Sequence, residues 1–169
     1  RFATMNSVIR AEGVKKNFYV GLKSKKVEAL KGLDFSVPEG TITCFLGPNG
    51  SGKSTFIKIA THLVSPTEGR VLFFDDQPYT KVRSRIGYVP EKPEFPGFLT
   101  PSEVLKFVGS ITANFEESRI LETLELVDLA HVKDRRCKGF SKGMNQRLAL
   151  AQALLSQPDL LILDEPFNG

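Results

Sequence analysis

The eight residues from Gly47 to Ser54, GPNGSGKS, constrain the fold of this chain more than any other segment. They fit the pattern G-x-x-x-x-G-K-[ST], and they lie between an apolar, β-prone run at 41–47 and a stretch with helical spacing at 51–64. In that setting glycines let successive backbone N–H groups point toward a phosphate, and the following helix adds its free N-terminal donors. The sequence therefore predicts an α/β fold in which a loop between a buried strand and a helix binds phosphate.

Side chains at the end of this loop add further chemistry. Lys53 supplies a mobile positive charge for the β- and γ-phosphates of a nucleotide, and the Ser54 hydroxyl can ligate Mg²⁺. The candidate nucleotide-binding residues of this segment are Gly47, Pro48, Asn49, Gly50, Ser51, Gly52, Lys53, Ser54 and Thr55. A chance glycine-rich turn is the alternative, which the position between a strand and a helix disfavours.

Two adjacent acids, Asp164 and Glu165, follow a second apolar run at 160–163. A strand beside the phosphate-loop strand would deliver Asp164 to the metal ion, directly or through water. Glu165 is one residue further along, so it points elsewhere and could accept a proton from a water that attacks the γ-phosphate. Two solvated acids at the end of a strand are the alternative.

The pattern becomes helical after a segment with three prolines, EKPEFPGFLTPS at 91–102. Thr100 predicts a helix start, with Pro101 at the first helical position and Glu103 completing a capping box. Two further helices are predicted over 115–129 and 141–155. We therefore expect a nucleotide-binding α/β core formed by 1–92 and 159–169, and a helical subdomain formed by 93–158.

Composition sets only broad limits on this chain of 169 residues. The net charge of +4 is a mild excess that suits polyanions without proving them as ligands. Cys44 and Cys137 do not make a disulfide framework, and Cys44, inside an apolar run, is most simply a small core residue. No apolar run approaches the roughly 18 residues needed to span a bilayer. Reducing, cytoplasmic surroundings are the default expectation.

Taken together, these motifs resemble the ATP-binding-cassette (ABC) transporter ATPases from about Val8 to Gly169. The phosphate loop, IGYVPE at 86–91 and FSKGMNQRLALAQALLSQPDLLILDEP at 140–166 fall in the family's order, at the positions of its phosphate loop, its Q-loop, and its signature motif with the Walker B strand. The resemblance implies a P-loop NTPase core of the ABC type with a helical subdomain. It also implies that Mg-ATP is bound and hydrolysed between two such domains to drive transport across a membrane.

The resemblance also assigns residues outside the phosphate loop. Ser141 and Gly143 would bind the γ-phosphate of ATP held by the other subunit, and a simple helix cap is the alternative for Ser141. Glu91 stands where the family carries a Q-loop glutamine; a carboxylate can still ligate Mg²⁺ but cannot donate a hydrogen bond. An aromatic ring that stacks on adenine should precede the phosphate loop, and Phe18 and Tyr19 are the candidates, with ordinary strand packing as the alternative.

Two positions in the signature segment depart from the family's common L-S-G-G-Q. Lys142 replaces the first glycine and Met144 replaces the glutamine. Together with Glu91, these departures are similar to a subset of bacterial exporter-type ATPases, so we interpret them as variation rather than as loss of the site.

The implied partners are a second ABC ATPase subunit and a transmembrane permease subunit. The permease would hold the protein at the cytoplasmic face of the cell membrane. No nucleic acid is expected as a partner, because the chain shows neither a long coiled-coil insertion nor a second cassette. Phe95 and Phe98 either help to form a surface groove for a permease helix or pack into the helical subdomain.

The sequence stops at Gly169, before the positions where the family carries the end of its D-loop and its switch histidine. We therefore expect ATP binding by this chain with slow turnover. A truncated nucleotide-binding module that binds ATP without efficient turnover is the alternative function.

Overall fold

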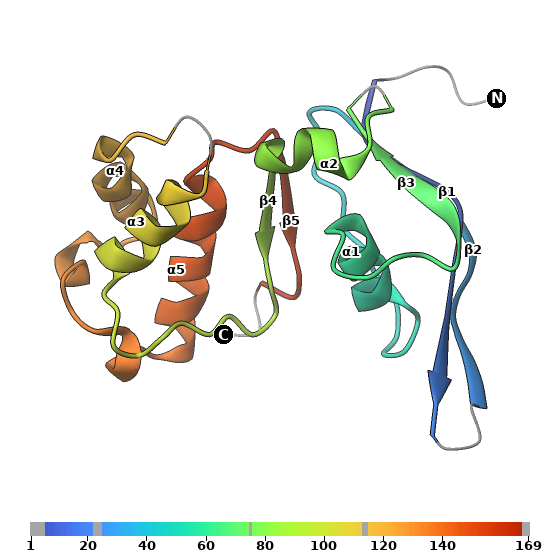
Figure 1. Cartoon of the computed structure of the whole chain (residues 1–169), viewed down its shortest axis with the longest axis horizontal. Helices are drawn as coiled ribbons and strands as arrows, with labels where there is room; N and C mark the ends of the chain where they lie inside the picture. Colours follow the sequence, from blue (N-terminus) through green and yellow to red (C-terminus); the bar gives the residue numbers. More distant parts are fainter. Residues whose placement is uncertain (1–5, 22–24, 75, 113–114, 167–169) are drawn as a thin grey trace. The chain divides into compact units, whose positions relative to one another are not determined.

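A computed structural model describes residues 6–21, 25–74, 76–112 and 115–166 (Figure 1). The chain divides into two compact units, residues 1–83 and 84–169. Both units combine helices with strands, as the α/β prediction requires.

The first unit is built on an antiparallel sheet with the strand order β2-β1-β3 (Figure 1). Its elements are β1 (Ser7–Val20), β2 (Lys25–Pro38), α1 (Lys53–Ala60), β3 (Glu68–Phe73) and α2 (Tyr79–Val82), followed by a 3-10 helix at Arg83–Arg85. Ala11 of β1 pairs with Phe35 on one side and with Val71 on the other. Ala11 and Val14 are buried, so the central strand supplies the core of this sheet.

Helix α1 packs on this sheet through an aromatic cluster. The ring of Phe56 meets Phe35 of β2 edge-to-face at 5.8 Å and stacks with Phe45 at 5.2 Å between ring centroids. The helical spacing at 51–64 comes from Phe56, Ile59, Ala60 and Leu63, and the first three of these are buried. Leu63, the fourth, is exposed because the helix ends at Ala60.

The apolar run at 41–46 does not form the buried strand that the sequence predicted. Ile42 is 98% exposed and Leu46 is 90% exposed. Cys44 is also exposed, so the expectation of a core cysteine is wrong. A buried strand needs neighbours that satisfy its backbone N–H and C=O groups, and no described strand pairs with this run. Its β-prone composition indicated an extended segment but could not indicate a partner.

The second unit combines a parallel strand pair with helices. Its elements are β4 (Ile86–Val89), α3 (Pro101–Ser110), α4 (Ser118–Leu126), α5 (Lys142–Leu154) and β5 (Leu160–Leu163), with 3-10 helices at Ala130–Val132 and Cys137–Gly139. β4 and β5 pair in parallel from Ile86 with Leu160 to Val89 with Leu163. Helix α5 packs on this pair closely, since a Cβ at Gly87 would lie 2.8 Å from the carbonyl oxygen of Ala153.

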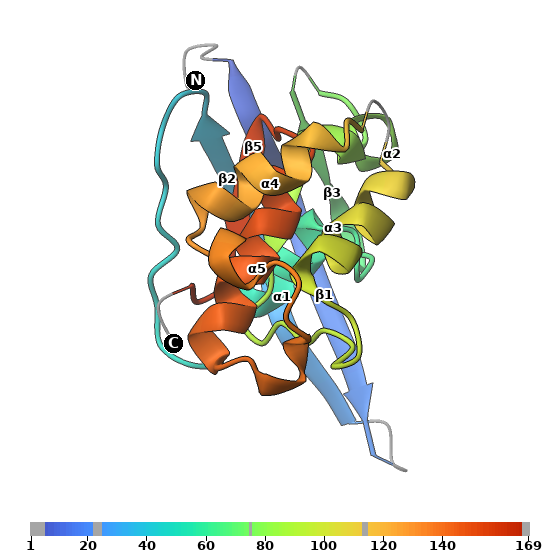
Figure 2. The same ribbon diagram turned by 90° about the vertical axis from the view of Figure 1, so that its left-hand side faces the viewer.

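Helices α3, α4 and α5 enclose the core of the second unit (Figures 1 and 2). The buried members of this core are Val104, Leu105, Ile120, Leu124, Val127, Leu129, Cys137, Leu148, Ala151 and Leu155. Each fully buried leucine contributes about 1.5–3 kcal/mol to folding relative to an exposed one. The helix predicted over 115–129 is shorter, because Asp128 adopts a left-handed backbone with φ of 56° just after α4.

The predicted capping box at the start of α3 is confirmed. The Glu103 amide donates to the Thr100 hydroxyl at 3.2 Å, and the Thr100 amide donates to the Glu103 carboxylate at 2.8 Å. Pro101 occupies the first turn, where a helix has no partner for its N–H group.

The sequence predicts 84–92 and 159–169 as part of the nucleotide-binding core, whereas contacts place β4 and β5 in the unit that holds α3, α4 and α5. The division into a core of 1–92 and 159–169 and a helical subdomain of 93–158 stays a prediction. Over the described ranges, no helix is both long and apolar enough to cross a membrane.

Candidate functional site

The lysine at the end of the phosphate loop, in the first unit, donates hydrogen bonds back to the start of the loop. The Lys53 ammonium donates to the carbonyl oxygen of Gly47 at 2.7 Å and to that of Pro48 at 3.0 Å. The Ser51 amide donates to the same Pro48 oxygen at 3.2 Å, which makes a turn inside the loop. The loop therefore holds the positive charge of Lys53 over its first two residues.

Gly52 joins the loop to α1 in a conformation and a space that only glycine accepts. Its φ is 95°, and a Cβ there would lie 2.6 Å from the carbonyl oxygen of Ala29 and 2.7 Å from the Leu30 side chain. Gly52 is also the N-cap of α1, so no side chain at that position accepts from the first-turn amides. These amides and the positive end of the helix dipole are suited to an anion.

The other predicted loop residues lie in the same continuous segment. Asn49 and Gly50 are exposed, and Gly50 has a φ of 82°. Ser54 and Thr55 are half-buried in the first turn of α1. The structure therefore brings together the whole sequence-predicted loop.

The two aromatic candidates lie on opposite faces of β1. Phe18 shares a face with Lys16, whose ammonium lies 5.0 Å from the centre of the Phe18 ring. Lys16 pairs with Leu30, the residue that packs against Gly52, and its ammonium donates to the Ser65 carbonyl oxygen beyond α1. Phe18 therefore lies on the face that the phosphate loop and α1 cover.

Tyr19, the next residue on β1, points to the other face of this hairpin. It is 69% exposed, against 38% for Phe18. Neither ring is buried in the core, and the choice between adenine stacking and ordinary strand packing stays a prediction.

The second unit brings two of the predicted acids to one end of its parallel strands. Asp164 is buried, and its amide donates to the carbonyl oxygen of Val89 at 2.9 Å. Glu91 follows the end of β4 by two residues. Burial, and then the negative charges of Asp164 and Glu91, raise the pKa of the Tyr88 phenol. Asp164 and Glu91 therefore both follow the carboxyl ends of β4 and β5, which pair in parallel.

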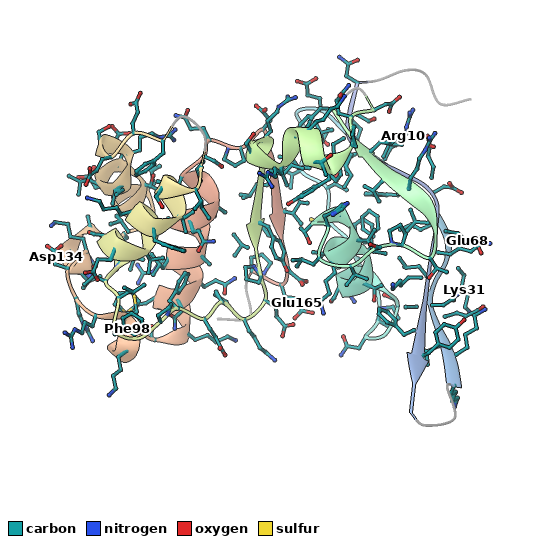
Figure 3. All side chains as sticks on the ribbon, in the orientation of Figure 1. Arg10, Lys31, Glu68, Phe98, Asp134 and Glu165 are labelled. Carbon is teal, nitrogen blue, oxygen red and sulfur yellow. The ribbon has the colours of Figure 1, made fainter. Side chains whose placement is uncertain are left out.

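Glu165 is exposed and has a left-handed backbone, with φ of 46° (Figure 3). This conformation costs a non-glycine residue about 1–2 kcal/mol. The chain therefore changes direction directly after Asp164, which separates the environments of the two adjacent acids. That the side chains of Asp164 and Glu165 serve different functions stays a prediction.

Ser141 is the N-cap of α5, and its hydroxyl accepts from the Met144 amide at 3.2 Å. A Cβ placed on Gly143 would meet nothing within 4 Å, so the first turn of α5 borders open space. Ser141 is exposed. The cap is therefore real, and the same helix end is accessible to an anion.

Sequence reasoning missed two residues of this region. The pKa of Tyr88 on β4 is raised by burial and by the charges of the acids, and the Gln146 side-chain amide donates to the carbonyl oxygen of Pro90 at 3.4 Å. This hydrogen bond ties α5 to the segment that carries Glu91. No residue pattern in the sequence indicates this contact, because its acceptor is a backbone carbonyl oxygen 56 residues away.

The donors expected to bind a metal are oxygen atoms, from the Ser54 hydroxyl and the carboxylates of Asp164 and Glu91. Oxygen donors suit Mg²⁺ in their chemistry. Among the described residues no group of three or more histidine, cysteine or acidic side chains is placed to hold a metal ion. A magnesium site would therefore rely on fewer acids together with a hydroxyl and the ligand itself, which is how Mg²⁺ binds with phosphates.

A cavity of about 400 Å³ lies in the second unit between α3 and α4. Its lining is Ser102, Glu103, Lys106, Glu117, Ile120, Leu121, Leu124, Lys133 and Asp134. None of the predicted metal-binding or catalytic residues belongs to this lining, and the Lys106–Glu117 ion pair at 2.7 Å already pairs two of its charges.

Residues 30–168 match the protein family described as ABC transporter. This match covers well over half of the sequence, so the chain belongs to the ABC transporter family and has the α/β P-loop NTPase fold of its ATP-binding domains. The resemblance drawn from the motifs is confirmed.

Two relatives illustrate the range of similarity. The ABC transporter ATP-binding protein YxlF of Bacillus subtilis is 41% identical over 145 residues, which are 84% of this chain and 48% of YxlF. The bacitracin transport ATP-binding protein BcrA of Bacillus licheniformis is 41% identical over 140 residues, which are 81% of this chain and 46% of BcrA. The chain thus spans about half the length of these curated relatives.

Among solved structures, the chain is similar to the dimeric post-hydrolysis state of the ATP-binding cassette MJ0796 bound to ADP and Pi. The TM-score is 0.82 with 28% sequence identity, and the likeness covers 95% of this chain and 75% of that one.

Proposed function

We propose that this chain binds Mg-ATP through the loop 47–54 as the nucleotide-binding part of an ABC transporter ATPase. The observation that carries the proposal is the position of the Lys53 ammonium, which donates to the carbonyl oxygens of Gly47 and Pro48 within the loop itself. Phosphate oxygens are stronger, charged acceptors and would take over these hydrogen bonds. The uncapped start of α1 would bind the same phosphates.

Phe18 rather than Tyr19 is the proposed adenine-stacking residue. Phe18 lies on the face of β1 that carries the phosphate loop, whereas Tyr19 lies on the opposite face. A ring on the loop's side can reach the base of a nucleotide whose phosphates the loop holds. The Lys16 ammonium lies 5.0 Å from the centre of the ring, and this cation–π contact favours the observed orientation.

Magnesium is the proposed metal, with Ser54, Asp164 and Glu91 as its protein ligands. When bound with ATP, Mg²⁺ neutralises phosphate charge and orients the nucleotide.

ATP hydrolysis is the proposed activity, with Glu165 as the general base. Its carboxylate would accept the proton of a water that attacks the γ-phosphate, while Lys53 stabilises the charge on the phosphate oxygens. Ser141 and Gly143 of a second copy would contact the γ-phosphate at an interface between two ATPase subunits. The open space beside Gly143 supports a close approach of the nucleotide to this helix end. Slow turnover by residues 1–169 alone stays a prediction.

A transmembrane permease is the proposed second partner, which would place the chain at the cytoplasmic face of a membrane. The name of BcrA, a bacitracin transport protein, supports a role in transport. Phe95 packs against the core of its unit, as one of the two alternatives expected, whereas Phe98 is 72% exposed on the loop before α3 (Figure 3). Phe98 is therefore the candidate for the contact with the permease.

Crosslinking tests this partner in the full-length gene product assembled with its permease. A cysteine at position 98 should crosslink to the permease. A cysteine at position 126 is the matched control, because Leu126 is an equally exposed apolar residue of the same unit. Equal crosslinking from both positions, or none from position 98, would remove Phe98 from the interface.

Calorimetric titration with Mg-ATP tests the central proposal. Loss of the Lys53 charge in Lys53→Ala should cost about 1.5–3 kcal/mol, which weakens binding by roughly 10- to 150-fold. Lys58→Ala is the matched control, because Lys58 is an exposed lysine later in the same helix. If Lys53→Ala binds as tightly as the unmodified chain, the loop is not the nucleotide site.

A further inference from the structure

Two segments about 40 residues apart in the sequence are joined by backbone hydrogen bonds in the second unit. The Cys137 amide donates to the Leu99 carbonyl oxygen at 2.8 Å, and the Lys138 amide donates to the Gly97 carbonyl oxygen at 3.0 Å. The Leu99 amide donates to the Pro96 carbonyl oxygen at 3.0 Å, so residues 96–99 form a turn. We call the two bonds from residues 137 and 138 the 97–138 bridge.

The bridge depends on close approach of two backbones. A Cβ at Gly97 would lie 3.1 Å from the Lys138 Cβ and 3.2 Å from its Cα. Either distance is tighter than most contacts that a Cβ makes, and both involve atoms that cannot rotate away. Gly97 does not have a left-handed backbone, so space rather than conformation calls for glycine at this position.

The bridge leads directly to the cap of α5. Cys137 is buried in the core, and its carbonyl oxygen accepts from the Phe140 amide at 2.9 Å in a 3-10 helix. Ser141 follows as the α5 cap, bound to the Met144 amide. The turn before Ser141 is thus fixed by the bridge, and the turn after it is fixed by the helix.

We infer that the 97–138 bridge positions Ser141 for the nucleotide of a second copy, which makes Gly97 a positioning residue of that site. The inference rests on the proposed function of Ser141, and it adds Gly97, from the loop before α3, to the residues on which that site depends. A Cβ at position 97 would require Lys138 to give way by a few tenths of an ångström, and the inference is that this shift passes along the chain to the Ser141 hydroxyl. Such displacements weaken contacts that need exact geometry.

A double-mutant cycle tests the inference in the full-length gene product. The readout is the concentration of a non-hydrolysable ATP analogue, with Mg²⁺, at which half of the protein is dimeric by light scattering. Ser141→Ala should raise this midpoint about 10-fold, as expected for a lost hydrogen bond to a charged group. Gly97→Ala should raise it by about 3-fold or more. In the double variant Gly97→Ala should add nothing, because the two residues act through the same hydroxyl.

Gly139→Ala is the matched control, since a Cβ there meets only the end of the Arg135 side chain, which can move. Its midpoint should equal that of the unmodified protein. Lys138→Pro is a second route, because it removes one donor of the bridge at a position in the first turn of a helix where proline is tolerated. It should reproduce the effect of Gly97→Ala.

The outcomes separate the inference from the proposed function. No effect of Ser141→Ala would overturn the role of Ser141 and the inference with it. A normal effect of Ser141→Ala, with Gly97→Ala either inert or fully additive, would overturn the inference alone. A loss of melting temperature in Gly97→Ala without a change in the dimerisation midpoint would show a purely structural role, which also overturns it.

Discussion

The Asp164 amide donates a 2.9 Å hydrogen bond to the carbonyl oxygen of Val89. Val89 is the last residue of β4, and Asp164 comes directly after β5, the strand that pairs with β4. Parallel strands have their carboxyl ends at the same edge of a sheet. Asp164 and the chain that follows β4 therefore begin at the same edge. Glu91 lies on that segment. Two acids from distant parts of the sequence therefore follow the same end of the strand pair, and their charges add to burial in raising the pKa of the Tyr88 phenol.

This arrangement predicts a specific dependence of stability on pH. Burial and the two nearby carboxylates raise the pKa of Tyr88 above its ordinary value of 10.0, because each disfavours the phenolate. Above about pH 10 the unfolded chain loses this proton first, so the folded state then binds more protons and the free energy of unfolding falls. Below that pH Tyr88 makes no pH-dependent contribution. Tyr88→Phe should remove this part of the decline.

Urea denaturation between pH 8 and pH 11 measures the effect. The difference in unfolding free energy between the unmodified chain and Tyr88→Phe should change with pH only in the alkaline part of the range. Tyr19→Phe is the control, because Tyr19 is largely exposed. A pH-independent difference for Tyr88→Phe would contradict the burial of a phenol beside two carboxylates.

Some elements could be predicted because their signals are local. The capping box of Thr100 and Glu103 needs only residues three positions apart, and both of its hydrogen bonds are present. Ser141 begins α5 for the same reason. Local side-chain contacts with free helix amides are encoded within one turn of sequence, so they can be predicted from the sequence alone.

A second prediction concerns the contribution of the Thr100 cap to stability. Thr100→Ala removes the acceptor for the Glu103 amide and should lower the free energy of unfolding by about 1 kcal/mol. Thr100→Ser keeps an acceptor oxygen at the same place and should stay close to the unmodified chain. Chemical denaturation of both variants measures the difference, and equal losses would show that the hydroxyl is not the source of the stabilisation.

Other features could not be predicted because they depend on partners far away in the sequence. The run at 41–46 looked like a buried strand, but burial of a strand requires neighbouring strands that its own composition does not specify. The 97–138 bridge uses backbone groups, which leave no trace in residue type except for Gly97. The same limit applies to Phe18 and Tyr19, which are neighbours in the sequence. Only the register of Lys16 with Leu30, together with the contact of Lys16 with the Phe18 ring, shows which face Phe18 takes.

A third prediction concerns the effect of Phe18 and Tyr19 on the affinity for Mg-ATP. Phe18→Ala should weaken Mg-ATP binding by about 1–3 kcal/mol, the range for loss of one base–aromatic stack. Tyr19→Ala, on the opposite face, should leave the affinity unchanged. Titrations with ATP and with inorganic triphosphate separate the roles, because only binding of the adenine-containing ligand should respond to Phe18→Ala. The reverse order of the two variants would assign the base to Tyr19.

The last prediction concerns Glu165 in the full-length gene product. Glu165→Gln keeps the shape and hydrogen-bonding capacity of the side chain but removes its basic carboxylate. Turnover, measured as phosphate release, should fall by roughly 100-fold or more, the range for losing a positioned general base. Mg-ATP binding should persist, because Lys53 and Asp164 are unchanged. Glu122→Gln is the control, since Glu122 is an exposed acid on α4, and it should turn over at the unmodified rate.

The nucleotide-bound dimer should accumulate in Glu165→Gln, because hydrolysis is the step that would separate the two copies. Size-exclusion chromatography in Mg-ATP measures this population beside the phosphate-release assay. A variant that hydrolyses ATP at the unmodified rate would exclude Glu165 as the base. A variant that is slow but remains monomeric in Mg-ATP would instead separate the chemistry from dimer formation, and it would contradict the proposed contact of Ser141 with the nucleotide of a second copy.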